Sequence, residues 1–517
     1  MKETSMKTPK TPIINPFLIP ALLAVVNLIP VGRVTAQTFT TLHSFTATTN
    51  GGPPYYFVTN SDGAQPWGRL ITNSSGNTLY GTAKYGGSWG VGAIFAVNTD
   101  STGFTNLYSF TANIGPGYTD YTNSDGAYPI AGLVLSSHTL YGTTRAGGTH
   151  KAGTVFAVNT DGTGFTNLHT FIGSDGATPE AELILSGNTL YGATTAGGSS
   201  GNANNGTVFA INTDGTGFTN LYSFTAGGYD PSNGLTNSDG AYPDAGLILS
   251  GNRLYGTALN GGSSGAGTVF AVNTDGTGFT NLHTFAPFST GPPYPRTNSE
   301  GGAPFAGVIL SDNTLYGTTY TGGSSGNGTV FAVNTDGTGF TNLHNFTALL
   351  SNTNGDGAGP EAELVLSGNT LYGTAGRGGS SGRGTVFAVH TDGTGFTNLH
   401  SLAGGDGAAP YAQLLFSGNT VYGTALNSGI AGGNGTVFSI SFPGPQLTIT
   451  PSGTNMILSW PANVAGFDYT GYTLQSTTNL GSPSVWGTNS PTPVVVNGQN
   501  TVTSPISGAQ QFYRLVQ

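Results

Sequence analysis

The sequence has 517 residues and a formal net charge of −10, with 85 glycines, no cysteine and only 7% charged residues. Soluble domains usually contain roughly 25% charged residues, so this composition excludes a coiled coil, a charged helical protein and a highly charged disordered chain. The absence of cysteine excludes disulfide scaffolds, thiolate metal sites and cysteine nucleophiles. The acidic balance argues against a nucleic-acid partner.

Residues 1–36 have the pattern of a secretory signal peptide. Lys2, Lys7 and Lys10 precede an apolar stretch from Phe17 to Val26, and Val-Thr-Ala at 34–36 supplies a small-residue cleavage site. Proline and asparagine interrupt the apolar residues, so no run approaches the 20 residues of a membrane helix. We expect a mature chain without a membrane span that is secreted to the extracellular space or the cell surface, with the periplasm as the alternative.

Internal repetition dominates the rest of the chain. A Leu/Val-Tyr-Gly tripeptide recurs every 50 to 64 residues, with its tyrosine at Tyr80, Tyr141, Tyr191, Tyr255, Tyr316, Tyr372 and Tyr422. In the unit that begins at Ser174, four short runs rich in β-branched and aromatic residues are separated by Gly, Asn, Asp and Ser. Repeats of this length with four antiparallel strands are typical of β-propeller blades, and the parallel β-helix is the alternative.

The two ends of the repeat region complement each other. The last unit stops after its third predicted strand, at Gly435 to Ser441, and the segment from Phe39 to Phe45 has the pattern of the missing fourth strand. The sequence therefore predicts a seven-bladed β-propeller over 37–442, with the last blade closed by the N-terminal strand.

The C-terminal residues lack the repeat. After a short linker at 443–445, residues 446–517 contain runs that read as strands and two tryptophans, Trp460 and Trp486, that we expect in a core. The number of strands predicts a small β-sandwich. The chain is thus expected to be all-β, with a propeller followed by a separate module.

The repeat blocks support a family resemblance. The block GTVFAVNTDGTGFTNLHTF at 153–171 recurs with DGAxP and SGNTLYGTTxxGGSSGxG, and this combination resembles the GloVer tandem repeat, a Gloeobacter/Verrucomicrobia type of repeat, over roughly residues 38–442. The C-terminal end, Gln-Phe-Tyr-Arg-Leu at 511–515, is similar to modules of secreted proteins of Verrucomicrobia. The resemblance implies a secreted or surface protein and no established activity.

Some units have long loops before their first strand, and these loops are rich in tyrosine. Variable loops on one face of a rigid scaffold are common binding sites, and tyrosine offers a flat apolar ring with a polar tip to a sugar or a protein. The alternative is that these side chains pack on their own loops. The candidate binding residues are Tyr55, Tyr56, Tyr118, Tyr121, Tyr229 and Tyr294.

An acid opens the first strand of every unit. Seven carboxylates around a central opening could bind Ca²⁺, and no other cofactor is expected. The alternative is structural, because Asp-Gly forms turns in which the carboxylate caps backbone N–H groups. The candidate metal ligands are Asp62, Asp125, Asp175, Asp239, Glu300, Asp356 and Asp406.

Two other recurrent positions are interpreted as structural. An aspartate such as Asp161 lies in the hairpin between the third and fourth strands, where turn formation explains it. Histidine recurs at one position of the fourth strand, as at His169, but tyrosine replaces it at Tyr108 and Tyr222, which indicates packing rather than metal binding.

Two functions remain open. The first is a secreted, non-catalytic recognition or scaffold protein that binds an extracellular glycan or a surface protein through the face that bears the loops. The second is a propeller enzyme, a glycosidase or lyase, that acts on polysaccharide. Near-uniform units and the absence of a catalytic motif favour the first, and no catalytic residue is assigned.

Overall fold

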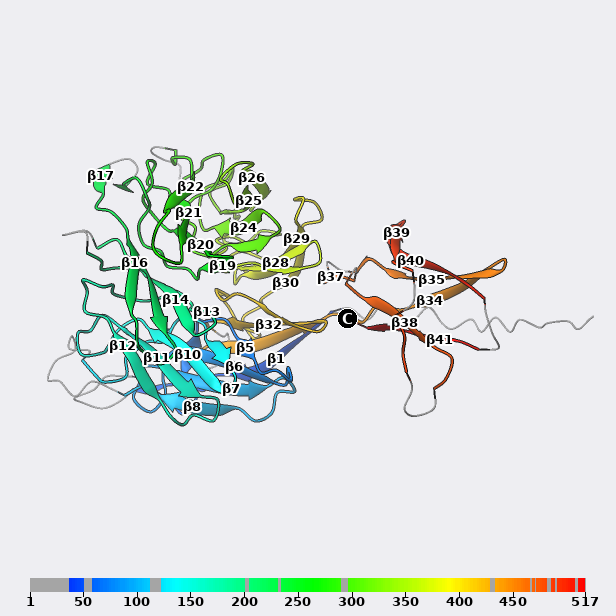
Figure 1. The fold of residues 1–517 in the computed structure, drawn as a ribbon, viewed down its shortest axis with the longest axis horizontal. Coiled ribbons are helices and arrows are strands. Elements are labelled where there is room, and N and C mark those ends of the chain that lie inside the picture. Colours follow the sequence, from blue (N-terminus) through cyan, green and yellow to red (C-terminus); the bar gives the residue numbers. More distant parts are fainter. Residues whose placement is uncertain are drawn as a thin grey trace, which may run out of the picture. The chain divides into compact units, whose positions relative to one another are not determined.

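The computed structural model describes residues 37–50, 58–111, 122–199, 204–230, 234–289, 296–427, 433–464, 467–469, 471–480, 485–488, 491–506 and 510–516. Every element of regular secondary structure within these residues is a β-strand, which confirms the all-β expectation (Figure 1). Because no helix occurs in these ranges, none is present there that could cross a membrane. The predicted signal peptide, residues 1–36, lies outside the described residues.

Antiparallel four-stranded sheets follow one another along the chain, each with its strands paired in sequence order. The first sheet differs slightly, because two short segments share the pairing to its second strand: β4 (Ala64–Pro66) and β5 (Ile71–Thr72) both pair with β6 (Thr78–Tyr85), which is followed by β7 (Ala93–Asn98) and β8 (Thr105–Ser109). The next sheets are β9 (Val134–Ser136), β10 (Thr139–Thr144), β11 (Thr154–Asn159) and β12 (Thr166–Thr170); β13 (Ile184–Ser186), β14 (Thr189–Thr194), β15 (Thr207–Asn212) and β16 (Thr219–Ser223); β19 (Ile248–Ser250), β20 (Arg253–Ala258), β21 (Thr268–Asn273) and β22 (Thr280–Thr284); β23 (Ile309–Ser311), β24 (Thr314–Thr319), β25 (Thr329–Asn334) and β26 (Thr341–Asn345); and β27 (Val365–Ser367), β28 (Thr370–Ala375), β29 (Thr385–His390) and β30 (Thr397–Ser401).

One further sheet joins the two ends of the repeat region. Its strands are β31 (Leu415–Ser417), β32 (Thr420–Ala425), β33 (Thr436–Ser441) and β1 (Thr38–Ser44), and β1 pairs antiparallel with β33 from Thr38↔Ser441 to Ser44↔Thr436. Figure 1 labels β1 and β32 of this sheet, in which β33 lies between them. The N-terminal segment thus provides the fourth strand that the last unit lacks, as the sequence predicts.

The local chemistry of each unit explains its strands and turns. Thr163 donates its backbone N–H to Asp161 Oδ1 over 2.9 Å, which fixes the hairpin between β11 and β12. The glycine of the Leu-Tyr-Gly tripeptide makes room for a core phenylalanine: a Cβ on Gly192 would lie 2.6 Å from the Phe209 ring. The tripeptide is therefore a packing motif, since only glycine lets the neighbouring strand's ring cross at this point.

Successive sheets stack through one aromatic pair each. The histidine or tyrosine of the fourth strand lies parallel to a phenylalanine of the following sheet, with ring centroids 3.7–4.2 Å apart. The pairs are His43–Phe104, Tyr108–Phe165, His169–Phe218, Tyr222–Phe279, His283–Phe340, His344–Phe396 and His400–Phe39. The packing interpretation of this position agrees with these contacts.

Short hairpins and a C-terminal group of sheets complete the described structure. The hairpins are β2 (Thr49–Asn50) with β3 (Val58–Thr59), and β17 (Gly228–Asp230) with β18 (Gly234–Thr236). The C-terminal sheets are β34 (Thr448–Ser452), β35 (Asn455–Pro461), β40 (Gln499–Pro505) and β39 (Val494–Val496); β36 (Asn463–Val464) with β37 (Phe467–Asp468); and β38 (Thr473–Thr477) with β41 (Phe512–Val516).

The two C-terminal tryptophans differ in burial. Trp460 is fully buried, as expected of a core residue. The expectation for Trp486 is wrong, because its side chain is only half-buried and Arg514 lies over its ring, 4.3 Å from the centroid. The strand β40 pairs with β35 along its whole length. It lies outside the runs that the sequence predicts as strands, which are 447–450, 456–460, 472–476, 494–496 and 512–516.

Candidate functional site

The acid that opens each unit is bonded to the end of the fourth strand that precedes it. Asp125 Oδ2 accepts hydrogen bonds from the Tyr108 hydroxyl at 2.8 Å and from the Thr111 backbone N–H at 2.9 Å. In every unit the acid has the same two kinds of partner, a fourth-strand His or Tyr at 2.7–3.1 Å and a backbone N–H at 2.7–2.9 Å. The seven acids are Asp62, Asp125, Asp175, Asp239, Glu300, Asp356 and Asp406.

These hydrogen bonds change the acidity of the carboxyl groups. Burial alone would raise the pKa of Asp62, but the hydrogen bonds from His43 and Thr46 outweigh it and leave the pKa below its ordinary value. The pKa of Asp356 is lowered for the same reasons. The carboxylates thus tie the end of the fourth strand to the start of the next unit.

The metal hypothesis stays a prediction. In the ranges that the structure describes, no group of three or more His, Asp or Glu side chains could hold a metal ion. None of the seven acids lines the central pocket described below.

The loop tyrosines can be placed in one case only. Tyr229 lies on β17 and its side chain is 80% exposed, so it is free to contact a partner. Tyr55, Tyr56, Tyr118, Tyr121 and Tyr294 lie outside the described residues.

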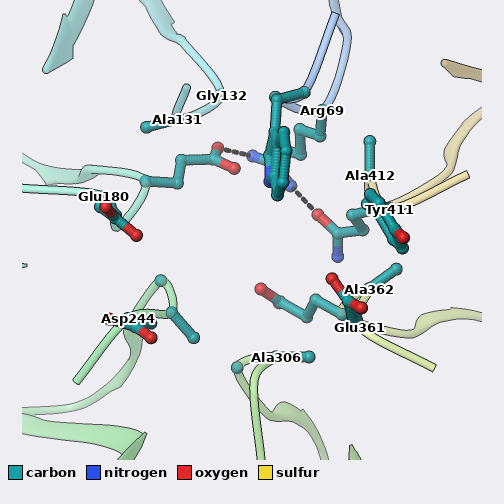
Figure 2. Close-up of a pocket in the computed structure, with 18 of the residues that line it drawn as sticks. Arg69, Ala131, Gly132, Glu180, Asp244, Ala306, Glu361, Ala362, Tyr411 and Ala412 are labelled. Carbon is teal, nitrogen blue, oxygen red and sulfur yellow. Dashed lines mark hydrogen bonds and ion pairs between the residues drawn. The ribbon is translucent and has the colours of Figure 1, made fainter. Parts of the chain in front are cut away.

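A pocket instead forms where the chain enters the first strand of each sheet. In the pattern DGAxP, the residue after the proline and the residue two positions later line a common cavity of about 130 Å³, and the small residue between them also lines it in six of the seven repeats. In extended chain the side chains i and i+2 share one face, so the two larger residues of each segment can point into one cavity. All seven repeats contribute, and Figure 2 shows their segments around the pocket.

We name the two sets of lining residues by their place in the pattern. The first ring consists of Trp67, Ile130, Glu180, Asp244, Phe305, Glu361 and Tyr411. The second ring consists of Arg69, Gly132, Glu182, Gly246, Gly307, Glu363 and Gln413. These two positions differ widely in chemistry from unit to unit, as do the position before the proline and the position of Lys84 and Arg145.

The first ring has an aromatic part and an acidic part. The rings of Trp67 and Tyr411 lie 5.4 Å apart, and Lys84 Nζ lies 4.9 Å from the Trp67 ring. On the acidic part, Arg145 Nε is 2.5 Å from Glu180 Oε1. Because Lys84 and Arg145 lie at or just after the end of a second strand, the first ring faces the side where the loops between second and third strands begin.

The second ring is organised around Arg69. Arg69 Nη2 is 2.6 Å from Glu182 Oε1, and Nη1 donates to Gln413 Oε1 at 2.8 Å (Figure 2). Gln413 in turn donates Nε2 to the Leu364 carbonyl at 3.0 Å. A bonded layer of charged and amide groups therefore crosses the pocket.

Glycines of the second ring give the two glutamates their space. A Cβ on Gly132 would lie 2.7 Å from Glu182 Oε2, and one on Gly307 would lie 3.0 Å from Glu363 Oε2. Both contacts are shorter than van der Waals contact allows, so any larger residue would displace these carboxyl groups.

Burial raises the pKa of most of these acids. It raises the pKa of Glu363 to about 8, with Arg69 opposing the shift and Glu182 adding to it. It raises the pKa of Asp244 and of Glu361 to about 7, although Arg145 and Arg377 respectively lower these values. Shifts of this kind concentrate at functional sites.

The sequence contained a signal for this pocket that the search for motifs did not use. The motifs are residues that recur, whereas the lining residues occupy two positions that change beside the recurrent Pro and Ala/Gly positions. When the seven units are aligned on the proline, the position after it holds aromatic, acidic or aliphatic residues. The position two further on holds an arginine, a glutamine or a glutamate in four units and glycine in three.

The fold and the pocket define an all-β repeat protein whose four-stranded sheets contribute to one common site. Residues 117–293 and 294–488 match the model of the Gloeobacter/Verrucomicrobia repeat. The chain belongs to the Gloeobacter/Verrucomicrobia repeat family, which confirms the resemblance seen in the repeat blocks.

Comparison with solved structures gives distant similarities. An enzyme named GH74 from Niastella koreensis is 14% identical, with a TM-score of 0.47, over 88% of this chain and 72% of the enzyme. An oligogalacturonate lyase from Vibrio parahaemolyticus is 9% identical, with a TM-score of 0.45, over 79% of this chain and 97% of the lyase. None of the curated proteins compared with the chain matches it.

Proposed function

We propose that the chain is a secreted recognition protein without catalytic activity that binds one sugar unit of an extracellular glycan in its central pocket. The observation that supports this most is the loss of repeat symmetry at the positions that line the pocket. Positions that form turns and sheet contacts keep the same residue type in each unit, whereas the two lining positions combine aromatic, acidic, cationic and glycine residues. Selection for folding does not require such variety.

The proposal includes the finer architecture. We take the repeat region, 37–442, to be a seven-bladed β-propeller closed by β1, the linker to be 443–445, and 446–517 to be a small β-sandwich. The β1–β33 pairing, the aromatic stack between successive sheets and a pocket lined from seven units support a closed ring. The pattern of residues 1–36 supports secretion.

The pocket offers the contacts that a pyranose needs. The apolar face of a sugar can lie against Trp67 and Tyr411, which provide flat apolar area. Ring hydroxyls can donate to the carboxyl groups of Asp244 and Glu361 and receive hydrogen bonds from the Gln413 amide. The long tyrosine-bearing loops would then contact neighbouring units of the same glycan or a surface protein.

The test is a binding screen on immobilised polysaccharides, run beside a product assay on the same polysaccharides. A Trp67→Ala/Tyr411→Ala variant should bind at least about tenfold more weakly, because loss of aromatic contact removes more than 1.4 kcal/mol. The matched control is Trp89→Ala, which removes a 52% exposed tryptophan outside the pocket. Undiminished binding by the pocket variant, or no binding by the wild-type protein, would contradict the proposal.

The loop tyrosines have their own variant in the same screen. Replacement of Tyr55, Tyr118 and Tyr294 by alanine should weaken binding to long glycans while the melting temperature stays within a few degrees, because added loop contributes little to stability. If binding depends on this variant and not on the pocket variant, the loops rather than the pocket recognise the glycan.

A second candidate function is glycoside hydrolysis, favoured by the unequal pair Glu182 and Glu363. Burial raises the pKa of both acids, and Arg69 opposes this shift for both. Only Glu182 forms an ion pair with Arg69, whereas Glu363 has a pKa of about 8 and is protonated at neutral pH. Glu363 would protonate the glycosidic oxygen, and Glu182 would accept a proton from the water that adds to the anomeric carbon. Release of reducing ends by the wild-type protein and its loss in Glu363→Gln would establish this function in place of the first.

A further inference from the structure

The carboxyl groups of the pocket divide by whether a cation pairs with them. Glu180 and Glu182 form ion pairs with Arg145 and Arg69. Asp244, Glu361 and Glu363 form no ion pair within 4 Å among the described residues. The pocket therefore holds three acids for which the chain provides no contacting cation.

The cations near these three acids are engaged elsewhere. Arg377, which faces Glu361, lies over the Tyr320 ring at 4.9 Å, and Arg69, which faces Glu363, is bonded to Glu182 and Gln413. Two other charged groups, Glu180 and Arg145, face Asp244, and Glu182 faces Glu363. The titratable hydroxyl of Tyr411 faces Glu361.

The carboxyl group of Asp244 is buried, and its hydrogen-bonding neighbour is the neutral hydroxyl of Thr195. Asp244 Oδ1 is inaccessible to solvent, and neither it nor the Thr195 hydroxyl makes a hydrogen bond of good geometry among the described residues. A ligand that supplies a donor to Asp244 would reduce the cost of burying this carboxyl group. Figure 2 places Asp244 and Glu361 on the rim of the same pocket as Arg69.

Aromatic rings complete the environment of these acids. The aromatic residues Trp67, Phe305 and Tyr411 belong to the first ring of lining residues, which also contains Asp244 and Glu361. Aromatic faces and carboxylates together are the surroundings that bind ammonium groups. We infer that the pocket selects a sugar with a protonated amine, so that the ligand is an amino-sugar unit of a glycan; this inference rests on the proposed function.

Binding of such a ligand is coupled to proton release. At pH 6.5, below the pKa values of about 7 and 8, Asp244, Glu361 and Glu363 are largely protonated without ligand. An ammonium group favours their ionised forms, so binding releases about one proton or more. For the same reason affinity decreases as the pH is lowered from 7 to 5.

The experiment is isothermal titration calorimetry with three tetrasaccharides that differ at one group: a glucosamine oligomer, its N-acetylated form and a glucose oligomer. The glucosamine oligomer should bind at least about tenfold more tightly than the others. Titration at pH 6.5 in buffers of different ionisation enthalpy should show proton release for this oligomer alone.

A triple variant, Asp244→Asn/Glu361→Gln/Glu363→Gln, tests the residues. It should lose the preference for the amine and bind the three oligomers with equal affinity, and a melting temperature like that of the wild-type protein would show that it still folds. Asp312→Asn is the matched control, because Asp312 is exposed outside the pocket at φ 51°, a conformation that asparagine adopts readily.

The outcomes separate the two levels of the argument. Equal affinity for the three oligomers overturns the amine inference and leaves sugar binding intact. A fourth ligand, Nα-acetyl-lysine amide, carries an amine but no sugar ring. If it binds as tightly as the glucosamine oligomer, the sugar part of the inference is overturned. No binding of any oligomer overturns the proposed function and the inference with it.

Discussion

The fourth-strand histidine has two partners that fix it in place. His169 stacks on Phe218 of the next sheet and contacts Asp175, which opens the next unit, through Nε2 at 3.0 Å. Burial lowers the pKa of His169, with Asp175 opposing the shift. Tyrosine performs the same two roles at Tyr108 and Tyr222, which explains why the position accepts either residue.

His169→Tyr tests this equivalence through pH. Because the folded pKa of His169 lies below its unfolded value, the unfolded chain binds more protons between the two values, and stability is lost as the pH falls from about 6.5. The variant should have the wild-type melting temperature at pH 8, and its melting temperature should fall less than that of the wild type when the pH is lowered to 5.5. Equal decreases in melting temperature for the two proteins would contradict the assignment.

The strand β1 is the element on which closure of the repeat region depends. It supplies an edge of the sheet that contains β33, and its Leu42 and Phe45 are buried, at 7% and 4% exposure. The aromatic contacts His400–Phe39 and His43–Phe104 add packing against the sheets on both sides. One ten-residue segment thus contributes to three sheets.

Deletion of residues 37–46 should lower the melting temperature and cause aggregation, because β33 would expose a row of unpaired backbone groups. The matched control is the chain that begins at Gln37, which retains β1. A milder version, Phe45→Ala, should cost about 3–5 kcal/mol of unfolding free energy as a large-to-small core substitution. Denaturation curves that coincide for the deleted chain and its control would disprove the closing role.

The molecule as a whole is symmetric in its sheets and asymmetric in its pocket. The symmetric features were predictable from the sequence, because repetition of the Leu-Tyr-Gly tripeptide and of the Asp-Gly turns repeats the same local physics in each unit. The complementary ends of the repeat region also predicted the β1–β33 pairing.

The pocket could not be read in the same way. Residues such as Arg69 and Glu363 form no motif along the chain, and they meet only because the segment that leads into the first strand of each sheet contributes to one central cavity. Likewise the seven recurrent acids read as candidates for one opening, whereas each is bonded to a histidine or tyrosine of the preceding fourth strand. Distinguishing these two sets required knowledge of which edge of each sheet faces the centre.

The central claim is that the variable positions of the repeat form a sugar-binding pocket. Its most direct test is an experimental structure of the chain that begins at Gln37, crystallised with the glucosamine tetrasaccharide. We predict that one sugar ring lies against Trp67 and Tyr411, with its amine toward Asp244, Glu361 and Glu363. A tetrasaccharide bound to the long loops or to residues 446–517, with the pocket unoccupied, would contradict the claim.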